Sequence, residues 1–375
     1  MRFIFYSSVA FEDWDWRNSV EKGIGGSETS HVEMAWRLAA RGHEVITYAP
    51  IPKDCPGEWR GTKWYDVRKI KEEDFKQKGV WIIYRLPPVI DLFPPIEDRV
   101  DQQVWFMMQD WDYPNWTQDR IHNCDRIITL SKAHGRDVIG KHPQIKKNLW
   151  LTSNGIKIDL IEETERMGIE RNPLRVMHAS SPDRGLKQAL ISFKKAREFV
   201  PELTFHAFYG FNNLEKLAKG SREIRLLIAD LKTRLSQPGV TFHGRVSQNE
   251  LYQEWMKSGI YIYETNFYET SNIASMEAQA MGAVPIFSPI FAQGENIKFG
   301  IGIEGDSYEP LTQSRFAAEL TRLATRVQLQ EEIRPAMMKW ARKRFDWEVM
   351  VTQWIFEAEG KRKEFESQYD FPSQL

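Results

Sequence analysis

Short apolar runs alternate with amphipathic segments along the first 140 residues of the chain. The run Arg2–Ser8 predicts a buried strand, Glu44–Ala49 predicts the next one, and apolar residues at helical spacing predict a helix over 27–40. Further predicted elements are the strands Val80–Tyr84, Gln103–Met107 and Arg126–Leu130, and a helix that begins after Ser131. Strands that alternate with helices predict a parallel sheet with helices on both faces.

A second alternating unit follows a pause in this pattern at residues 154–173. Its predicted strands are 174–179, 203–209, 240–243 and 260–263, and its predicted helices are 186–200, 215–235, 248–257 and a helical tail from 311 to about 360. We therefore predict an α/β chain of two Rossmann-like, doubly wound domains. One spans residues 1–160 and is completed by a C-terminal helix at about 348–375, and the other spans 161–347. Because ligands of such sheets bind at the carboxyl ends of the strands, we expect a central cleft between the domains.

Composition narrows the function classes. Lys and Arg number 51 and Asp and Glu number 52, which argues against a protein that binds nucleic acid by bulk charge. Cys55 and Cys124 lie far apart without a CxxC pair, so neither a zinc site nor a disulfide framework is indicated, and a reducing cytoplasm is the simplest setting. The first residues indicate a strand rather than a signal peptide, and no apolar run approaches the roughly 18 residues of a membrane span.

The segment 267–287 carries two carboxylates, Glu269 and Glu277, followed by small and apolar residues. On a single helix the two would lie about 80° apart, on different faces. We therefore place Glu269 in a loop and expect a helix to begin near Ser271 or Asn272, either of which can act as an N-cap. The helix start then offers N–H groups and a positive dipole end to an anion. A nucleotide-sugar, with phosphate between two hydroxyl-rich ends, has the matching chemistry; alternatively, both acids are ordinary surface or capping groups.

Two other loops join a strand to a helix. The segment Gly23–Glu28 is rich in glycine and could bring backbone N–H groups close to an anion, although its spacing matches neither GxGxxG nor a P-loop. In the loop 179–186 and just beyond it, Arg184 and Lys187 could pair with a diphosphate. The alternatives are a tight turn in the first case and solvated surface cations in the second.

Polar residues also follow two further strands. The residues 243–246 end a strand of the second domain, and 109–112 end a strand of the first. Such positions lie on the ligand side of a parallel sheet. The chain contains no HExxH, GxSxG or EF-hand pattern, and its eight scattered histidines indicate no metal site.

Taken in order, these motifs resemble those of the retaining GT-B glycosyltransferases of the family-4 type, over nearly the whole chain. The matching segments are Gly25–Glu28 with Leu38–Val45, Ser153–Ile156, Ser181–Leu186, Glu269–Glu277 and Phe345–Trp347. The resemblance implies a GT-B fold, two Rossmann-like domains that face a central cleft. It also implies transfer of a sugar from a nucleoside diphosphate sugar, with a UDP-sugar as the expected donor, to an acceptor hydroxyl. The transfer would retain the anomeric configuration and need neither a metal nor another cofactor.

The resemblance further implies roles for single residues. Glu277 would bind the ribose hydroxyls of the donor, and Glu269 would contact the transferred sugar. Arg184 takes the place of the family's phosphate-binding lysine, and Lys187 would assist it in stabilising the leaving diphosphate. The other donor-binding positions, near the phosphates, the sugar or the base, are Gly25, Gly26, Arg245, Val246, Asn272, Ile273 and Ala274.

Two departures from the family pattern matter. Ser180 or Ser181 lies where members often carry an arginine, which leaves diphosphate binding to Arg184 and Lys187. Gln109 lies where many members have a histidine that touches the sugar. An amide can hydrogen-bond a sugar but cannot carry a proton at neutral pH, so a general-base role at this position is in doubt.

Other function classes stay open. A nucleotide-sugar epimerase or hydrolase would act without an acceptor, and a nucleotide- or glycan-binding module would bind a donor without turnover. An NAD-type oxidoreductase lacks its glycine fingerprint. The acceptor of a transferase, whether a small molecule, a glycan, a protein or modified nucleic acid, is expected on the first domain. The contacts expected there, in the loop 11–22 and the stretch 110–116, include Asp110. They also include Trp14, Trp16 and Trp111, which lie in polar sequence and could stack on a sugar or a nucleobase.

Overall fold

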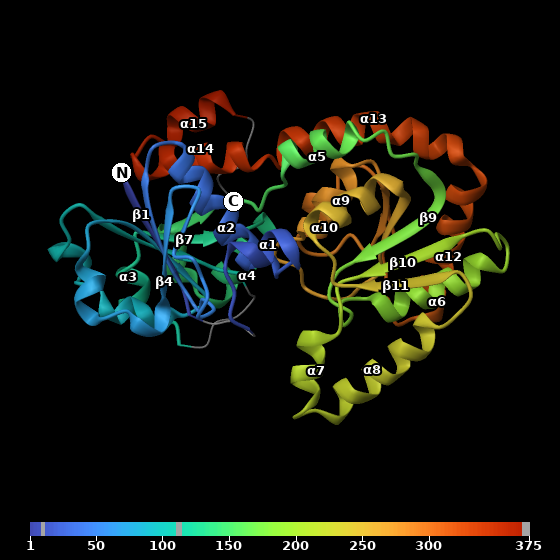
Figure 1. The fold of residues 1–375 in the computed structure, drawn as a ribbon, viewed down its shortest axis with the longest axis horizontal. Coiled ribbons are helices and arrows are strands. Elements are labelled where there is room, and N and C mark those ends of the chain that lie inside the picture. The colour runs from blue at the N-terminus through green and yellow to red at the C-terminus, as the bar shows by residue number, and fades with distance from the viewer. Residues whose placement is uncertain (9–11, 110–114, 370–375) are drawn as a thin grey trace. The chain divides into compact units, whose positions relative to one another are not determined.

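The computed structural model describes residues 1–8, 12–109 and 115–369. The chain forms two compact units, each built on its own sheet (Figure 1). Unit 1 comprises Met1–Val20, Ile24–Gly155 and Phe345–Leu375, and unit 2 comprises Glu21–Gly23 and Ile156–Arg344. The prediction of an α/β chain with two parallel sheets is confirmed.

The sheet of unit 1 has eight strands in the described residues, in the order β3-β4-β2-β1-β5-β6-β7-β8. They are β1 (Arg2–Ser7), β2 (Glu44–Ala49), β3 (Glu58–Trp59), β4 (Thr62–Asp66), β5 (Gly79–Tyr84), β6 (Gln102–Met107), β7 (Arg126–Thr129) and β8 (Leu149–Leu151). Neighbouring strands are parallel, apart from β3 and β4 at one edge. Because β1, β5 and β6 are adjacent and parallel, the residues that follow them meet at one edge of the sheet.

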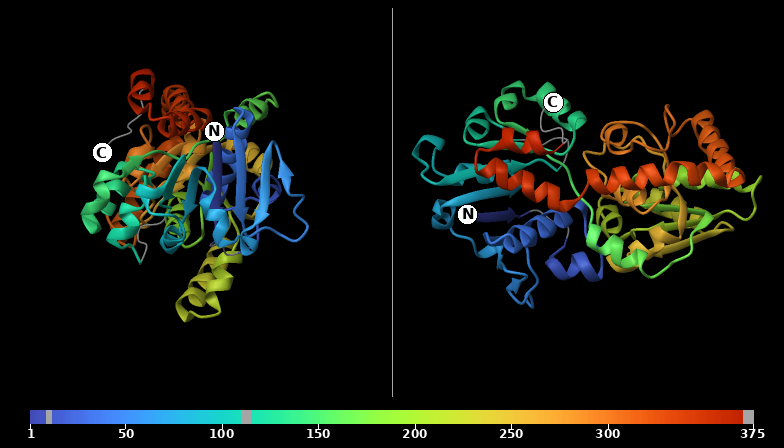
Figure 2. Two further views of the ribbon diagram at one scale, coloured as in Figure 1. Left: turned by 90° about the vertical axis from the view of Figure 1, so that its left-hand side faces the viewer. Right: turned by 90° about the horizontal axis from the view of Figure 1, so that it is seen from above.

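Helices cover both faces of this sheet (Figure 2). They are α1 (Trp16–Glu21), α2 (Gly26–Ala40), α3 (Gln118–His122), α4 (Lys132–Lys141), α14 (Trp347–Ala358) and α15 (Arg362–Gln368), with short 3-10 turns η1 (Val67–Lys69), η2 (Glu72–Lys76), η3 (Pro87–Leu92), η4 (Ile96–Asp98) and η5 (Pro143–Lys147). On one face, Leu38 of α2 and Trp354 of α14 pack in the same core cluster as Phe5. On the other, Ile121 of α3 and Val138 of α4 pack in a cluster with strand residues.

The sheet of unit 2 is parallel, and in the described residues it has six strands in the order β11-β10-β9-β12-β13-β14. They are β9 (Asn172–Ala179), β10 (Thr204–Phe208), β11 (Val240–Gly244), β12 (Ser258–Tyr263), β13 (Val284–Phe287) and β14 (Ile301–Gly302). The helices are α5 (Ile158–Glu165), α6 (Leu186–Arg197), α7 (Asn212–Ala218), α8 (Arg222–Leu235), α9 (Gln248–Lys257), α10 (Ile273–Ala280), α11 (Gln293–Asn296), α12 (Pro310–Thr325) and α13 (Val327–Arg344). Phe193 of α6 and Phe316 of α12 pack with Phe205 of β10 in its main apolar core.

Two local predictions were wrong. The single helix expected over 215–235 is divided into α7 and α8, because Ser221 caps a new helix by accepting a hydrogen bond from the N–H of Ile224 at 3.3 Å. The segment around Trp16, expected as a loop, forms α1. Among the described residues, no helix combines the length and apolar character that a membrane crossing needs.

The loop between β9 and α6 approaches the end of β12 very closely. Gly185 in this loop has φ +92°, in the left-handed region, and a Cβ added to it would lie 2.0 Å from the carbonyl oxygen of Glu264. A side chain at this position would therefore clash with the backbone carbonyl of Glu264, which cannot move aside as the end of a flexible side chain could. The contact places Arg184, the preceding residue, beside the segment that follows β12.

We expect Gly185→Ala to lower the free energy of unfolding by about 1–3 kcal/mol from its backbone conformation alone, with the steric clash in addition. The matched control is Gly220→Ala, because nothing lies within 4 Å of a Cβ at that glycine. Urea unfolding followed by circular dichroism measures both variants. Equal midpoints for the two variants would contradict the packing described for Gly185.

Candidate functional site

Glu269 is a buried carboxylate in the loop after β12, and two groups from other positions hold it. The hydroxyl of Tyr263, the last residue of β12, donates a hydrogen bond to its Oε1. The guanidinium of Arg184 lies 3.2 Å from the same oxygen and 4.2 Å from the centroid of the Phe267 ring. The resulting ion pair joins the β9–α6 loop to the β12–α10 loop.

The start of α10 lies three residues beyond Glu269. The side chain of Asn272, one of the two residues predicted as the N-cap, accepts a hydrogen bond from the N–H of Ser275 at 3.2 Å and is the N-cap. Within the described part of the chain, the N–H groups of Ile273 and Ala274 have no acceptor, and both residues are only half-buried. First-turn N–H groups and the helix dipole favour an anion at such a position.

Glu277 lies one and a half turns into α10 and is buried against α9. The indole N–H of Trp255 donates to its Oε2 at 3.3 Å. Burial raises the pKa of Glu277 to about 7, although hydrogen bonds from Trp255 and Tyr252 lower it in part. The two carboxylates of the motif therefore lie on either side of the helix start in different environments, one paired with a cation and one among neutral donors.

Glu264, directly after β12, is a third buried acid that the sequence analysis did not single out. The hydroxyl of Ser192 donates a hydrogen bond to its Oε2 at 2.6 Å and lies 3.1 Å from the carbonyl oxygen of Gln313. Burial raises the pKa of Glu264 to about 8, although the hydrogen bond from Ser192 lowers it in part.

Lys187, Arg245 and Val246 are three other residues of unit 2 that were predicted on the donor side. The ammonium of Lys187 forms an ion pair with Asp230 of α8 at 2.8 Å. Arg245 lies with its guanidinium 5.6 Å from the centroid of the Tyr209 ring. Val246 directly precedes Ser247, the N-cap of α9. The structure thus brings Arg184 to Glu269, while Lys187 is held by a neighbouring helix.

In unit 1, polar residues meet where β5 and β6 end and α2 begins. Gln109 is buried and accepts a hydrogen bond from the hydroxyl of Ser27 at 3.1 Å. Arg85, which follows β5, donates to Ser27 and, at 3.0 Å, to Oε1 of Glu28. A Cβ at Gly25 would lie 2.4 Å from Oε2 of Glu28. The absence of a side chain at Gly25 therefore leaves room for the carboxylate of Glu28 beside the loop. Arg85 and Glu28 were not predicted as site residues. Arg85 follows a predicted strand and Glu28 lies at the start of a predicted helix, and these positions could have identified them as candidates.

Two of the residues expected to contact an acceptor, Trp14 and Trp16, lie in a core of unit 1. The rings of Trp14 and Trp16 are only 1% and 6% exposed and pack with Trp64 in an aromatic core cluster. Neither ring therefore has a free face for a sugar or a base, and the stacking role predicted for them does not fit the structure. Asp110 and Trp111 lie outside the described residues.

No protein-family model matches the chain, and neither does any curated protein. Solved structures do match it. A glycosyltransferase from Rickettsia africae ESF-5 aligns over 98% of this chain and 99% of its own length, with a TM-score of 0.71 and 13% sequence identity. HepE from Anabaena, solved with UDP and glucose, aligns over 96% and 99%, with a TM-score of 0.67 and 15% identity. Sucrose-phosphate synthase from Thermosynechococcus elongatus aligns over 98% and 99%, with a TM-score of 0.65 and 13% identity.

The chain has a GT-B fold. The α/β class with two Rossmann-like domains, predicted from the sequence, is therefore confirmed for nearly the full length of the chain. At these identities the likeness establishes the fold. The activity has to be inferred from the residues of the site.

The raised pKa of Glu264 predicts a pH dependence of stability. Its pKa of about 8 in the folded state lies above the ordinary 4.5, so the unfolded chain loses this proton as the pH rises from 4.5 while the folded chain keeps it. This contribution to stability is therefore complete below pH 4.5 and lost as the pH rises to 8. In Glu264→Gln the amide keeps the shape of the neutral acid at every pH. We therefore compare the free energy of unfolding of the variant with that of the wild type at each pH. Between pH 5 and pH 8.5 this difference should shift in favour of the variant by on the order of 2–4 kcal/mol.

Urea unfolding at pH 5, 7 and 8.5 measures this difference. The control is Glu202→Gln, which changes an exposed carboxylate and should follow the wild type at every pH. The shift of Glu277 is present in all three proteins and cancels. Parallel stability curves for Glu264→Gln and the wild type would show that Glu264 is ionised in the folded chain at neutral pH.

Proposed function

We propose that this protein is a glycosyltransferase that moves a sugar from a nucleoside diphosphate sugar to an acceptor hydroxyl. The observation that carries the proposal is the helix start of α10. Among the residues that the structure describes, two N–H groups of this helix start have no acceptor, and the helix start lies in the chain between the buried carboxylates Glu269 and Glu277. The N–H groups of Ile273 and Ala274 would bind the diphosphate. Glu277 would accept hydrogen bonds from the ribose hydroxyls, and Glu269 from the transferred sugar.

The choice of donor rests on the fold and on the chemistry of the site. HepE, which shares the GT-B fold, was solved with UDP and with UDP-glucose, so a UDP-sugar is the donor we propose. Arg245 and Val246 would lie near the base. Gly25 and Gly26, at the start of α2, would lie near the diphosphate and the sugar, and Gln109 would hydrogen-bond the sugar.

The chemistry of the site supports a mechanism in which the protein positions its substrates and stabilises the leaving diphosphate. Arg184 and the start of α10 would supply that positive charge without a metal ion. Lys187 would add to it on leaving Asp230. No carboxylate is assigned as a base, because Glu269 is paired with Arg184 and Glu277 is reserved for the ribose. We propose that the transfer retains the anomeric configuration.

Glu277→Ala is expected to weaken the binding of UDP by about tenfold or more, because the ribose hydroxyls lose their acceptor. Isothermal titration calorimetry with UDP measures this loss. The charge-matched control is Glu223→Ala, an exposed position on α8 that should bind UDP as the wild type does. Equal affinity in Glu277→Ala and the control would remove Glu277 from the donor site.

Arg184→Ala is expected to lower kcat by about 100-fold or more, because the leaving diphosphate loses its main cation. Lys187→Ala should have a smaller effect, since Lys187 is paired with Asp230. Release of UDP from UDP-sugars, with and without candidate acceptors, measures turnover, and Arg222→Ala on the surface of α8 is the control. Wild-type turnover in Arg184→Ala would contradict its role. Rapid isomerisation of the donor without an acceptor would instead identify an epimerase.

A further inference from the structure

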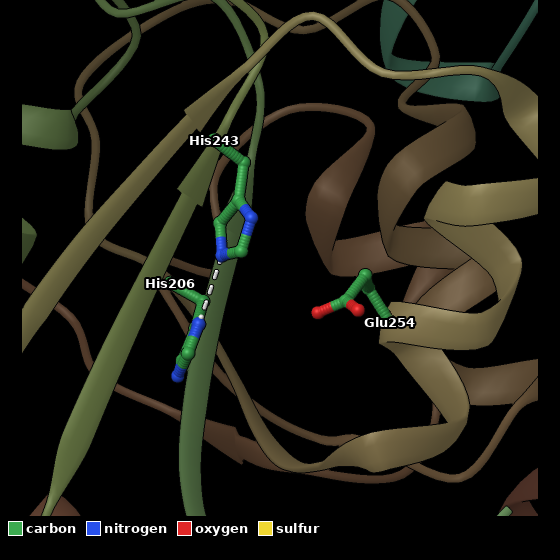
Figure 3. A group of neighbouring side chains, drawn as sticks. All are labelled: His206, His243 and Glu254. Carbon is green, nitrogen blue, oxygen red and sulfur yellow. Dashed lines mark hydrogen bonds between the residues drawn. The ribbon is translucent and has the colours of Figure 1, made fainter.

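Three potential metal ligands from three different elements lie together in unit 2, on the face of the sheet that α9 covers (Figure 3). They are His206 of β10, His243 of β11 and Glu254 of α9, and their ligand atoms lie within 4.8 Å of one another. Figure 3 shows the two imidazoles edge to edge, with the carboxylate of Glu254 directed toward them. No local pattern in the sequence marks this group, because the two histidines lie 37 positions apart.

The distances suit a transition metal ion. Nδ1 of His206 and Nε2 of His243 are 3.0 Å apart. Two nitrogens bound to one tetrahedral Zn²⁺ at its usual bond lengths lie about 3.3 Å apart. The two histidine nitrogens would have to separate by a few tenths of an ångström, and the carboxylate of Glu254 would have to move toward them. All three ligand atoms would then lie at bonding distance from one ion.

The protonation of the pair also suits a metal. One of the two facing nitrogens donates a hydrogen bond to the other. Both nitrogens become ligands once the proton between them moves to the opposite nitrogen of its own ring, a change of tautomer in a neutral imidazole. No charged hydrogen bond has to be broken for the two lone pairs to point at one ion.

Neighbouring side chains hold two of the three ligands, His243 and Glu254, in orientation. The ring of Phe208 stacks on His243 with centroids 4.2 Å apart. Arg175 and Lys257 donate to the two oxygens of Glu254, the latter at 2.6 Å. Each carboxylate oxygen has a second lone pair, so Glu254 can accept these hydrogen bonds and still bind a metal, as ligating carboxylates commonly do.

We propose that His206, His243 and Glu254 form a binding site for a divalent transition metal ion such as Zn²⁺, with water completing the coordination. The two histidines are half-buried, and β11 is the edge strand of its sheet, so an ion can enter from solvent at that edge. The bound ion would cross-link β10, β11 and α9, because each of these elements contributes one ligand. The nearby cations Arg175 and Lys257 oppose a divalent ion, so we expect micromolar rather than nanomolar affinity.

Co²⁺ titration of the whole, chelator-treated chain tests the site, because Co²⁺ bound by nitrogen and oxygen at low coordination number absorbs visible light more strongly than the aqueous ion. We expect one such Co²⁺ per chain, displaced by Zn²⁺, and a Tm about 5 °C higher at saturating Zn²⁺. His206→Ala and His243→Ala should each weaken binding by about 100-fold, and Glu254→Gln by about tenfold or more. His122→Ala, which removes an exposed histidine of unit 1, should bind as the wild type does.

The outcomes separate the proposal from a purely structural hydrogen-bond network. Absence of Co²⁺ absorption in the wild type overturns the proposal, and this measurement needs no variant. Wild-type affinity in His206→Ala and His243→Ala places the ion elsewhere and overturns it too. If the histidine variants do not fold, the conservative Glu254→Gln decides: loss of absorption supports the site and unchanged absorption overturns it.

Discussion

The close approach of the Gly185 backbone to the carbonyl oxygen of Glu264 is the constraint on which the polar arrangement of unit 2 depends. Only a residue without a side chain fits there, and the contact brings the β9–α6 loop onto the end of β12. Arg184 then meets Glu269, which the hydroxyl of Tyr263 already holds. A cation and a carboxylate that lie 85 positions apart in the sequence are thus fixed at the helix start of α10.

Three glutamates within fourteen residues serve three purposes because their surroundings differ. Glu269 faces a guanidinium and forms an ion pair, whereas burial raises the pKa of Glu264, which accepts a hydrogen bond from Ser192, to about 8. Glu277, with a pKa of about 7, lies among the neutral donors of α9. The charge of Glu269 is compensated by Arg184, and burial disfavours the ionised forms of Glu264 and Glu277. The negative charge near the N–H groups of Ile273 and Ala274 is therefore low, and a low negative charge favours the binding of a diphosphate.

The features that the sequence predicted are those encoded within a few neighbouring residues. The apolar runs predicted the buried central strands, and single polar residues predicted the caps Ser131 and Asn272, because strand periodicity and capping are local. The ion pair of Arg85 with Glu28 and the grouping of His206 with His243 join distant positions. The end of a strand and the start of a helix mark Arg85 and Glu28 singly, but no local pattern marks either pairing. Stacking by Trp14 and Trp16 was predicted from polar neighbours, but both rings lie in the core. The edge strand β3 and its neighbour β4 are short and carried too few apolar residues to be recognised.

The central claim is that the start of α10 binds the diphosphate of a nucleotide-sugar between Glu269 and Glu277. A crystal structure of the protein grown with UDP tests it most directly. The account predicts phosphate oxygens at about 2.9 Å from the N–H groups of Ile273 and Ala274 and ribose hydroxyls on the carboxylate of Glu277. A nucleotide bound elsewhere in the chain, with the start of α10 occupied only by water, would contradict it.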